Sequence, residues 1–244
     1  MSDIILILGA QSDIGRAIAH QYAKHGYELY LAARNASRLD ADVSDLRIRY
    51  GAKARFFEFD ALAFDTHKDF YASLPAAPDI VCCVFGVFAE TTQTINNWHI
   101  AYNIMQVNYV GAVSILEQVA QQMQASQKGT IIGISSIAGD RGRGKNYIYG
   151  SSKAAFTAYL SGLRNRLQQY GVHLLTVKPG FVATKMIEGL DAPAALTAEP
   201  SQVAQAVYHA AKNKRHVIYS KWIWRYIIWI IRLIPEFIFK KMNI

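Results

Sequence analysis

Short, nearly continuous apolar runs alternate with longer segments of helical periodicity along most of the chain. The apolar runs have the length of buried strands and cover 3–8, 28–33, 54–59, 79–85, 130–135, 173–178 and 216–219. The segments with helical periodicity cover 14–25, 36–50, 66–73, 98–125, 149–170 and 201–212. Strands that are apolar on both faces and alternate with helices are typical of parallel sheets between two helical layers. The pattern therefore predicts an α/β fold with a doubly wound parallel sheet.

Length and composition favour one large domain followed by a distinct tail. With 244 residues the chain can bury a sizeable core, and no break in composition marks a second domain. We expect the main domain over 1–215 and an apolar, basic arm over 216–244. The stretch 185–200, which contains Gly189, Pro193 and Pro200, is the expected mobile loop.

The two cysteines, Cys82 and Cys83, are adjacent within an apolar run. This arrangement is typical of reduced core residues, so we expect no disulfide, and the pair offers too few ligands for a metal site. The chain also enters its first apolar run at once, without the basic leader of a signal peptide. These observations predict a cytoplasmic protein with no bound metal.

The chain is basic, with a formal net charge of +8 and a pI near 9.4. The positive residues are not gathered with aromatic residues into a motif that binds nucleic acid. We therefore expect no nucleic-acid partner, and assign part of the charge to the C-terminal tail.

A glycine-containing turn, Gly9-Ala10-Gln11-Ser12-Asp13-Ile14-Gly15, joins the first predicted strand to the first predicted helix. Such a turn lets the backbone approach a pyrophosphate, and the helix N-terminus supplies amide donors and the positive end of its dipole. The spacing is wider than G-x-G-x-x-G, so an ordinary strand–turn–helix is the alternative. We predict a Rossmann-type cofactor site at Gly9, Gln11, Ser12, Asp13, Ile14 and Gly15. Asp13, where a further glycine is usual, should point away from the phosphates or cap the helix.

The end of the second predicted strand indicates which dinucleotide binds. An acid there would bind the ribose 2′-hydroxyl of NAD, but the chain has Ala33 followed by Arg34, with Arg38 one turn later. Guanidinium groups pair with a 2′-phosphate, so we expect NADP(H) as cofactor and NAD(H) as the second choice. The alternative is that both arginines are simply solvated.

A tyrosine and a lysine four residues apart, Tyr149 and Lys153, share one face of the predicted helix 149–170. An ammonium group near a phenol is expected to lower the tyrosine pKa and make it a proton donor near neutral pH. Ser136 follows the apolar run 130–135, where its hydroxyl can bond a substrate carbonyl. Taken alone, the tyrosine–lysine pair also fits an exposed surface helix.

These features together resemble the short-chain dehydrogenase/reductase family over residues 3–215, by their order and spacing. The resemblance rests on Gly9 and Gly15, Asp60, Asn108, Ser136, Tyr149, Lys153 and the segment Lys178-Pro179-Gly180-Phe181-Val182-Ala183-Thr184. It implies an enzyme that moves hydride between NAD(P)H and a ketone or alcohol, and a homodimer or homotetramer. The fourth strand departs from the family, because the usual Asn-Asn-Ala-Gly reads Cys83-Val84-Phe85-Gly86, and only Gly86 matches.

The resemblance also implies roles for single residues. Tyr149 is the general acid in reduction, Lys153 lowers its pKa and holds the nicotinamide ribose, and Ser136 orients the carbonyl. Asn108 supports a water relay and Asp60 contacts adenine. Pro179 and Gly180 form a turn after which Val182 and Thr184 hold the nicotinamide carboxamide. Tyr147 is a weaker candidate for the acid, because no lysine follows it by four residues.

A narrower resemblance points to reductases of a keto-pentose carried on decaprenyl phosphate, which complete an epimerisation begun by a flavin-dependent oxidase. It rests on Phe85-Gly86, on 139–147, on Ala195-Leu196-Thr197 and on 233–239. It implies a lipid-linked ketone as substrate and a flavin oxidase as partner. Reduction of another lipid or acyl-carrier ketone, of the 3-oxoacyl type, is the first alternative. A cofactor-binding membrane partner without catalysis is the second.

Basic residues lie between the serine and the tyrosine, at Arg141, Arg143 and Lys145. That position would bring them to the substrate entrance, where they would bind an anionic group such as a phosphodiester. A solvated glycine-rich loop is the alternative interpretation.

The tail 217–244 combines aromatic and apolar residues with scattered cations. Arg225 and Arg232 interrupt the apolar run, so a membrane span is not expected. Lys221, Arg225 and Arg232 fall near one face of a helix, which predicts a basic amphipathic helix at the inner face of the membrane. Pro235 is expected to start a second short helix. A packing arm in a subunit interface is the alternative.

Overall fold

The protein is described here by a computed structural model that covers residues 3–189 and 192–242. Its seven-stranded sheet is parallel throughout, in the order β3-β2-β1-β4-β5-β6-β7. The strands are β1 (Ile4–Leu8), β2 (Glu28–Ala33), β3 (Ala54–Glu58), β4 (Ile80–Cys83), β5 (Thr130–Ile134), β6 (His173–Pro179) and β7 (Val217–Ser220). The expected doubly wound α/β fold is confirmed.

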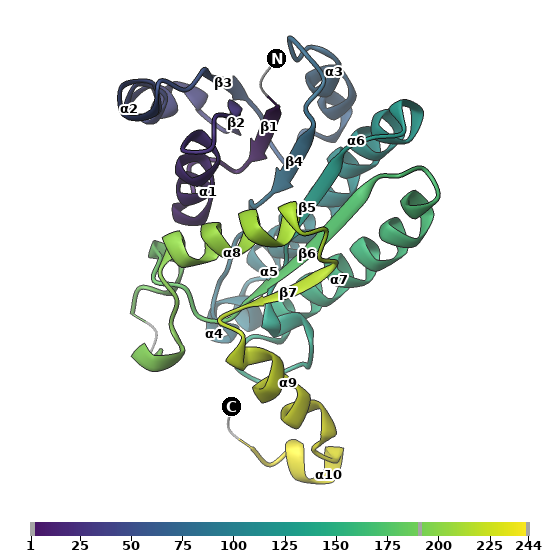
Figure 1. Ribbon diagram of the computed structural model, residues 1–244. Coiled ribbons are helices and arrows are strands. Elements are labelled where there is room, and N and C mark those ends of the chain that lie inside the picture. Colours follow the sequence, from purple (N-terminus) through teal and green to yellow (C-terminus); the bar gives the residue numbers. More distant parts are fainter. Residues whose placement is uncertain (1–2, 190–191, 243–244) are drawn as a thin grey trace.

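Helices cover both faces of this sheet (Figure 1). They are α1 (Asp13–Ala23), α2 (Asp40–Tyr50), α3 (His67–Ala72), α4 (Thr91–Asn96), α5 (Trp98–Met105), α6 (Ala112–Ser126), α7 (Tyr147–Gln168), α8 (Pro200–Lys212), α9 (Ile223–Leu233) and α10 (Glu236–Phe239). Successive residues of β1 point to opposite faces, so Ile5 and Ile7 join the core under α1, α2 and α8, while Leu6 and Leu8 join the core under α6 and α7. Each such fully buried side chain stabilises the fold by about 1.5–3 kcal/mol.

The strand order reverses between β1 and β4, and the crevice at the carboxyl ends of these strands is where doubly wound folds bind ligands. Gly9, directly after β1, has φ +95°, and a Cβ on it would lie 2.6 Å from the Phe85 nitrogen. Only glycine therefore lets the two loops approach here. The turn expected to hold phosphates and the segment 84–86 meet at this reversal point.

The helical boundaries differ from the sequence prediction in several places. The single helix expected over 98–125 is interrupted by a π-helical segment, Gln106–Gly111, and α4 was not predicted. The helix expected over 36–50 opens with a 3-10 turn at Ala36–Leu39. The loop expected over 185–200 contains short 3-10 turns at Lys185–Ile187 and Ala194–Leu196, while its residues 190–191 lie outside the described part. Both cysteines are buried and unbridged.

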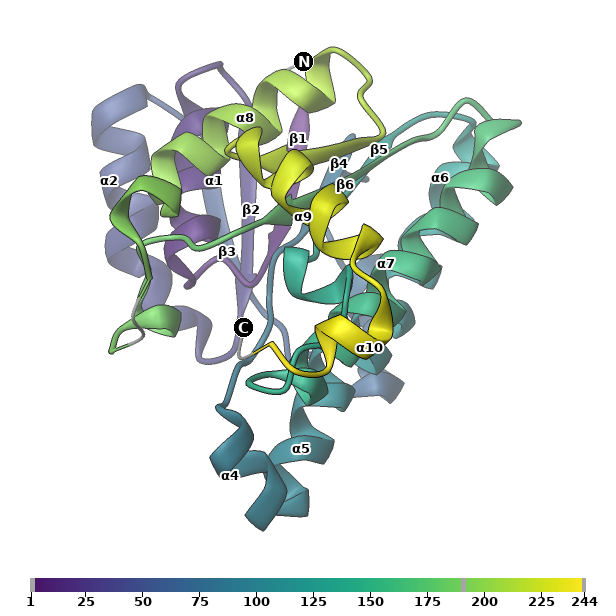
Figure 2. The same cartoon turned by 90° about the horizontal axis from the view of Figure 1, so that it is seen from below.

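The first residues of the expected arm 216–244 form a strand, as the sequence also predicted there. Val217–Ser220 pairs with β6 as the edge strand of the sheet, and the helical part of the arm follows it. The arm lies at the carboxyl end of the sheet (Figures 1 and 2). One stripe of α9, with Trp224 and Ile228, is buried in a small apolar cluster with Ile137.

The basic face predicted for this tail is only partly correct. Lys221 precedes α9, has φ +56°, and donates a hydrogen bond to the Ala195 carbonyl, so it does not share the helix face of Arg225 and Arg232. The second short helix does form, with Pro235 as its N-cap residue. Within 3–189 and 192–242, no helix combines the length and the apolar character that crossing a membrane requires.

Candidate active site

The glycine turn after β1 is built as a backbone cradle. A Cβ on Gly15 would lie 2.6 Å from the Gly9 carbonyl oxygen, so this position also requires glycine. Ser12 is the N-cap of α1: its hydroxyl accepts a hydrogen bond from the Gly15 amide at 3.0 Å and donates one to the Gly9 carbonyl at 2.8 Å. Such a cap aligns the first amides of the helix at the turn, which fits the binding of a pyrophosphate.

Asp13 does not cap α1, contrary to one of the two roles considered for it. It is the first residue of the helix, and its carboxylate accepts a hydrogen bond from the backbone amide of Lys185 at 2.9 Å. The carboxylate is thereby directed toward the segment after β6. This contact agrees with the alternative expectation that Asp13 points away from the phosphates.

A hollow of about 190 Å³ runs from the glycine turn to the end of β2. Its walls include most of the residues predicted for the nucleotide half of the cofactor: Gly9, Gln11, Ser12, Arg34, Asp60 and Gly86. The Gln11 amide donates to the carbonyls of Arg34 and Asn35, so it joins the turn to the loop after β2. Asp60 accepts a hydrogen bond from the Leu62 amide.

Glu58 is a residue of this region that sequence reasoning missed. Its two carboxylate oxygens accept hydrogen bonds from the Asn35 and Ala36 amides, both at 2.8 Å. Glu58 thus fixes the backbone next to Arg34 and places a negative charge there. Its position at the last residue of β3 was visible in the sequence, but its partners were not.

A second, more apolar hollow of about 170 Å³ contains the residues predicted to be catalytic. Ser136 and Tyr149 line it with Lys153, and so do Ile14, Gly86, Pro179, Gly180, Val182 and Thr184. The Phe88 ring meets the Tyr149 ring edge-on at 5.2 Å between centroids and is a further wall residue that was not predicted. The structure therefore brings together the predicted serine, tyrosine and lysine and the predicted nicotinamide-binding segment.

Burial controls the protonation of Tyr149 and Lys153. It raises the pKa of Tyr149 to about 12, against the opposing effect of a hydrogen bond with Ser136. It lowers the pKa of Lys153 to about 8. Burial therefore sets the direction of the net shift of the Tyr149 pKa, with the Lys153 ammonium 5.9 Å from the ring centroid. The effect of Lys153 on this pKa stays a prediction. With this pKa Tyr149 is a neutral phenol at pH 7, which is the form that the predicted proton donor needs.

A Lys153→Met variant is expected to have a larger free energy of unfolding than the wild-type protein near pH 7. Between pH 8 and 10.5 the unfolded chain holds a proton that folded Lys153 has released, so wild-type stability rises with pH in that window. Methionine has no such contribution. Below pH 8 the free energy of unfolding of the variant should exceed that of wild type by about 3 kcal/mol, less about 1 kcal/mol because the variant loses the hydrogen bond to the Ile134 carbonyl. This difference should shrink as the pH rises toward 10.5. Urea unfolding across this range measures it, and a difference independent of pH would contradict it.

Asn108 lies in the π-helical segment and is 1% exposed. Its amide oxygen accepts from the Val87 amide at 2.8 Å, and its amide nitrogen donates to the Val87 carbonyl and to the Ser152 hydroxyl. These bonds tie the segment after β4 to α7, one residue from Lys153. Asn108 thus holds the floor of the catalytic hollow, and its part in a water relay stays a prediction.

The three basic residues of the loop between Ser136 and Tyr149 lie in different surroundings. Arg143 lines the catalytic hollow, where burial lowers the pKa of its guanidinium, and Lys145 is exposed. Arg141 instead contacts the C-terminal arm: it donates to the Ile231 and Ile234 carbonyls and pairs with Glu236. The predicted substrate contact of Arg141 is therefore wrong, because the arm occupies its guanidinium.

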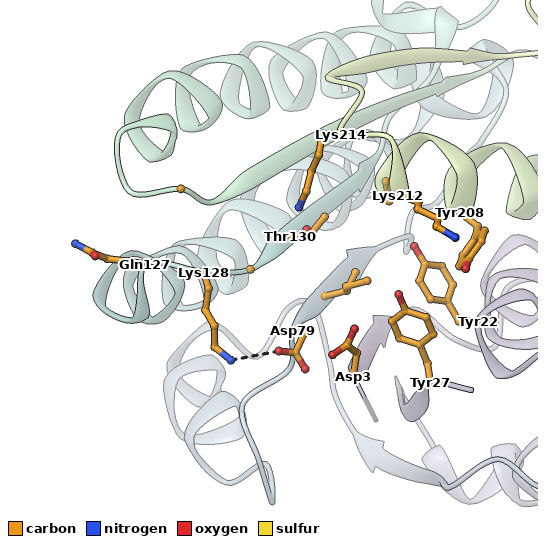
Figure 3. Close-up of a pocket in the computed structure, with 14 residues that line it drawn as sticks. Asp3, Tyr22, Tyr27, Asp79, Gln127, Lys128, Thr130, Tyr208, Lys212 and Lys214 are labelled. Atoms are coloured by element: carbon orange, nitrogen blue, oxygen red, sulfur yellow. Dashed lines mark hydrogen bonds and ion pairs between the residues drawn. The ribbon is translucent and has the colours of Figure 1, made fainter. Parts of the chain in front are cut away.

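A separate hollow of about 390 Å³ lies at the amino end of the strands (Figure 3). Tyr22, Tyr27 and Tyr208 enter it from one side, and a Lys128–Asp79 ion pair lies on the other (Figure 3). Among the described residues the Tyr22 hydroxyl has no hydrogen-bond partner, but it is itself inaccessible to a water-sized group. None of the catalytic candidates lines this hollow.

The fold and the catalytic hollow define a nucleotide-dependent oxidoreductase. A family model described as short chain dehydrogenase matches residues 3–195, and the chain belongs to the short-chain dehydrogenase/reductase family. Its members act on CH–OH and C=O groups with NAD(P)H, so the chain is an enzyme of this class. Within the described residues, 3–189 and 192–242, no cluster of His, Cys, Asp and Glu suits a metal ion.

Two curated relatives are similar over nearly the whole chain. An uncharacterized oxidoreductase of Mycobacterium tuberculosis is 34% identical, covering 98% of this chain and 96% of that protein. Another from Streptomyces coelicolor is 32% identical, covering 98% and 95%. Among solved structures, a 3-oxoacyl-[acyl-carrier protein] reductase from Brucella melitensis in complex with NAD has a TM-score of 0.80 and 25% identity, over 91% of this chain and 96% of that one. A short-chain dehydrogenase from Sphingobium yanoikuyae in complex with NADPH has the same TM-score at 21% identity, over 96% and 97%.

Proposed function

We propose that this enzyme reduces the ketone of a keto-sugar carried on a polyprenyl phosphate, with NADPH as the reductant. The observation that carries the chemical part is the convergence of Ser136, Tyr149 and Lys153 on one apolar hollow beside the Gly9–Gly15 turn. The turn and the segment 179–184 form the cofactor site, and a bound NADPH supplies hydride to the carbonyl carbon. The requirement for glycine at two places in the turn supports this fit.

The residues of the chain handle the oxygen of the carbonyl. The Ser136 hydroxyl donates a hydrogen bond to the ketone oxygen and so positions the substrate. As negative charge develops on that oxygen, the neutral Tyr149 phenol delivers its proton, and the Lys153 ammonium stabilises the phenolate left behind. The apolar wall around Phe88 keeps bulk water from competing for the proton. The convergence of Ser136, Tyr149 and Lys153 on one hollow, with Asn108 bonded to Ser152 behind it, disfavours a role as a non-catalytic binding partner.

The preference for NADPH rests on Arg34. This exposed arginine borders the hollow next to the glycine turn. Of the two solved relatives above, the Sphingobium yanoikuyae dehydrogenase is in complex with NADPH and the Brucella melitensis reductase with NAD. A guanidinium at this place pairs with a 2′-phosphate. The Glu58 carboxylate does not compete for this guanidinium, because it is already bonded to backbone amides. NAD(H) is the second choice.

Replacing Arg34 with aspartate is expected to weaken NADPH binding by about 10- to 100-fold, because a charge-assisted hydrogen bond contributes about 1.5–3 kcal/mol. NADH lacks the 2′-phosphate and should lose far less. Quenching of protein fluorescence by each dinucleotide measures both affinities. Arg55→Asp, an equal charge change at an exposed site on β3, is the control. Equal weakening of NADPH and NADH by Arg34→Asp would contradict the role of Arg34.

The keto-sugar assignment draws on the narrower sequence resemblance, which is to decaprenylphosphoryl-2-keto-erythro-pentose reductase. Arg143 supports it, because this cation lines the catalytic hollow and suits an anionic substrate group. The resemblance would also give the enzyme a flavin-dependent oxidase as partner. Reduction of a 3-oxoacyl group is the second candidate, favoured by the similarity to the Brucella melitensis reductase.

NADPH oxidation with a polyprenyl-phosphate 2-ketopentose, beside an acetoacetyl thioester, tests the substrate. Turnover of the keto-sugar that is lost in Tyr149→Phe supports the proposal. Turnover of the thioester alone would assign the enzyme to acyl-chain reduction. We further propose a homodimer or homotetramer in the cytoplasm, with peripheral contact to the inner face of the membrane.

A further inference from the structure

The C-terminal arm exposes a continuous apolar stripe on the side that faces away from the domain. Trp229 is 63% exposed and Leu233 62%, and with Tyr226 and Ile230 they follow the three- and four-residue spacing of one face of α9. The residue before the helix, Trp222, and Phe237 of α10 are also exposed, so the stripe continues past both ends of α9. Soluble domains seldom leave so many large apolar side chains together without a partner.

The charges around this stripe have one sign. Arg225, Arg232, Lys240 and Lys241 are exposed beside it. The one acid between Lys221 and Met242 is Glu236, which is paired with Arg141. A surface that is apolar in the middle and cationic at its margins complements an anionic lipid interface. Aromatic side chains such as Trp222 and Trp229 suit the same boundary between water and hydrocarbon.

The arm is held so that this stripe cannot turn inward. The Arg141 guanidinium bonds the carbonyls at the end of α9 and lies 3.7 Å from the ring centroid of Phe239. At the start of α9, Trp224 donates a hydrogen bond to the Leu196 carbonyl and packs directly over Gly180. The buried stripe of the helix is therefore already occupied, and the exposed stripe is presented outward.

We propose that residues 222–242 dock on an anionic lipid surface, with the exposed stripe of Trp222, Tyr226, Trp229, Ile230, Leu233 and Phe237 in the interface and the flanking cations at the headgroups. A second copy of the arm is a poorer partner, because a twofold contact would bring like charges together around the stripe. This inference rests on the arm alone and does not depend on the substrate or the reaction.

Docking would also orient the enzyme. The arm lies at the carboxyl end of the sheet (Figure 2). Gly180 belongs to the wall of the catalytic hollow and also contacts the buried Trp224 of the arm. The hollow is thereby brought next to the lipid surface. A ketone with a long apolar chain could keep that chain in the bilayer while its head group enters the hollow.

Co-sedimentation of the full-length protein with phosphatidylcholine vesicles, with and without phosphatidylglycerol, tests the docking surface. We expect binding to the anionic vesicles, weakened by salt, since each cation near the surface contributes about fivefold. The double variant Tyr226→Glu, Trp229→Glu should lower the bound fraction at least about tenfold. Ile48→Glu is the matched control, because Ile48 is 87% exposed on α2, away from the arm. Point variants are used because truncation after Lys214 would also remove β7.

Circular dichroism and light scattering of each variant complete the experiment. A folded double variant that still sediments with anionic vesicles as wild type does would overturn the proposal, as would failure of the wild-type protein to bind them. A third outcome would assign the stripe to a second copy of the chain instead. In that case the wild-type protein is oligomeric and does not bind vesicles, while the double variant is monomeric. None of these readouts uses activity, so they stand apart from the test of the substrate.

Discussion

Replacing Tyr149 with phenylalanine is expected to abolish most turnover while leaving the fold and cofactor binding intact. The phenol lines the catalytic hollow and is the proton donor that we propose, and proton transfer by a positioned side chain contributes about 10²- to 10⁴-fold to rate. The variant should lower kcat by that amount, since the hydroxyl stabilises charge that develops only in the transition state. Initial rates of NADPH oxidation with the keto-sugar measure the loss.

The control for this variant is Tyr147→Phe. Tyr147 lies two residues earlier, at the start of α7, but it is exposed and does not line the hollow. It should keep wild-type turnover. Dinucleotide binding to Tyr149→Phe, followed by fluorescence, should match wild type because the phenylalanine ring still fills the wall against Phe88. A Tyr149→Phe enzyme with normal kcat would remove Tyr149 from the chemistry and require another proton donor.

Replacing Gly180 with alanine is expected to displace the C-terminal arm and destabilise the protein by about 1–3 kcal/mol. A Cβ at this position would lie 2.0 Å from the indole nitrogen of Trp224, which is itself held by the Leu196 carbonyl. The indole must therefore move, and its hydrogen bond is lost. Because Gly180 also lines the catalytic hollow, turnover should fall as well. Urea unfolding gives the free energy of unfolding, and tryptophan emission reports the position of Trp224.

The control, Gly162→Ala, makes the same chemical change but is expected to stabilise the protein rather than destabilise it. Gly162 lies inside α7, and a Cβ there meets nothing within 4 Å. Alanine should stabilise the helix by about 0.5–1 kcal/mol, since glycine carries an entropic cost there. Destabilisation by both variants, or by neither, would mean that the packing of Trp224 on Gly180 does not constrain this site.

The sheet was predictable because its strands are buried on both sides and read as continuous apolar runs. Each predicted strand matches an observed one within a few residues, including the short edge strand Val217–Ser220. The helix Thr91–Asn96 was missed because its residues, Thr-Thr-Gln-Thr-Ile-Asn, carry almost no apolar periodicity. It begins instead through a capping box between Glu90 and Gln93, which local side-chain bonds define.

The proximity of the candidate site residues was predictable because spacing within one element places them. Tyr149 and Lys153 share a turn of α7, and the glycine turn lies within a single strand–helix unit. Contacts between distant segments were not predictable in this way. Arg141 reaches Ile231, 90 residues later, and Glu58 reaches the amides after β2, and no pattern in the sequence indicates either partner. The net rise of the Tyr149 pKa was not predictable for a related reason, because the depth of burial is a property of the assembled fold.

The π-helical segment at Gln106–Gly111 affects how this region tolerates a change in chain length. A π-helical turn contains one more residue than an α-helical turn, so deleting one residue here would join α5 and α6 into a continuous α-helix. The flanking helices would keep their facing in that case, because the π-helical turn already takes up the extra residue. A one-residue deletion elsewhere in α5 or α6 would instead rotate the two halves against each other by about 100°, the angle that one residue occupies in an α-helix. The buried Ala101 and Ile104 of α5 would then turn toward solvent, or Asn108 would leave Ser152. The π-helical turn is therefore a position at which this region can lose a residue while the buried faces of α5 and α6 stay in register.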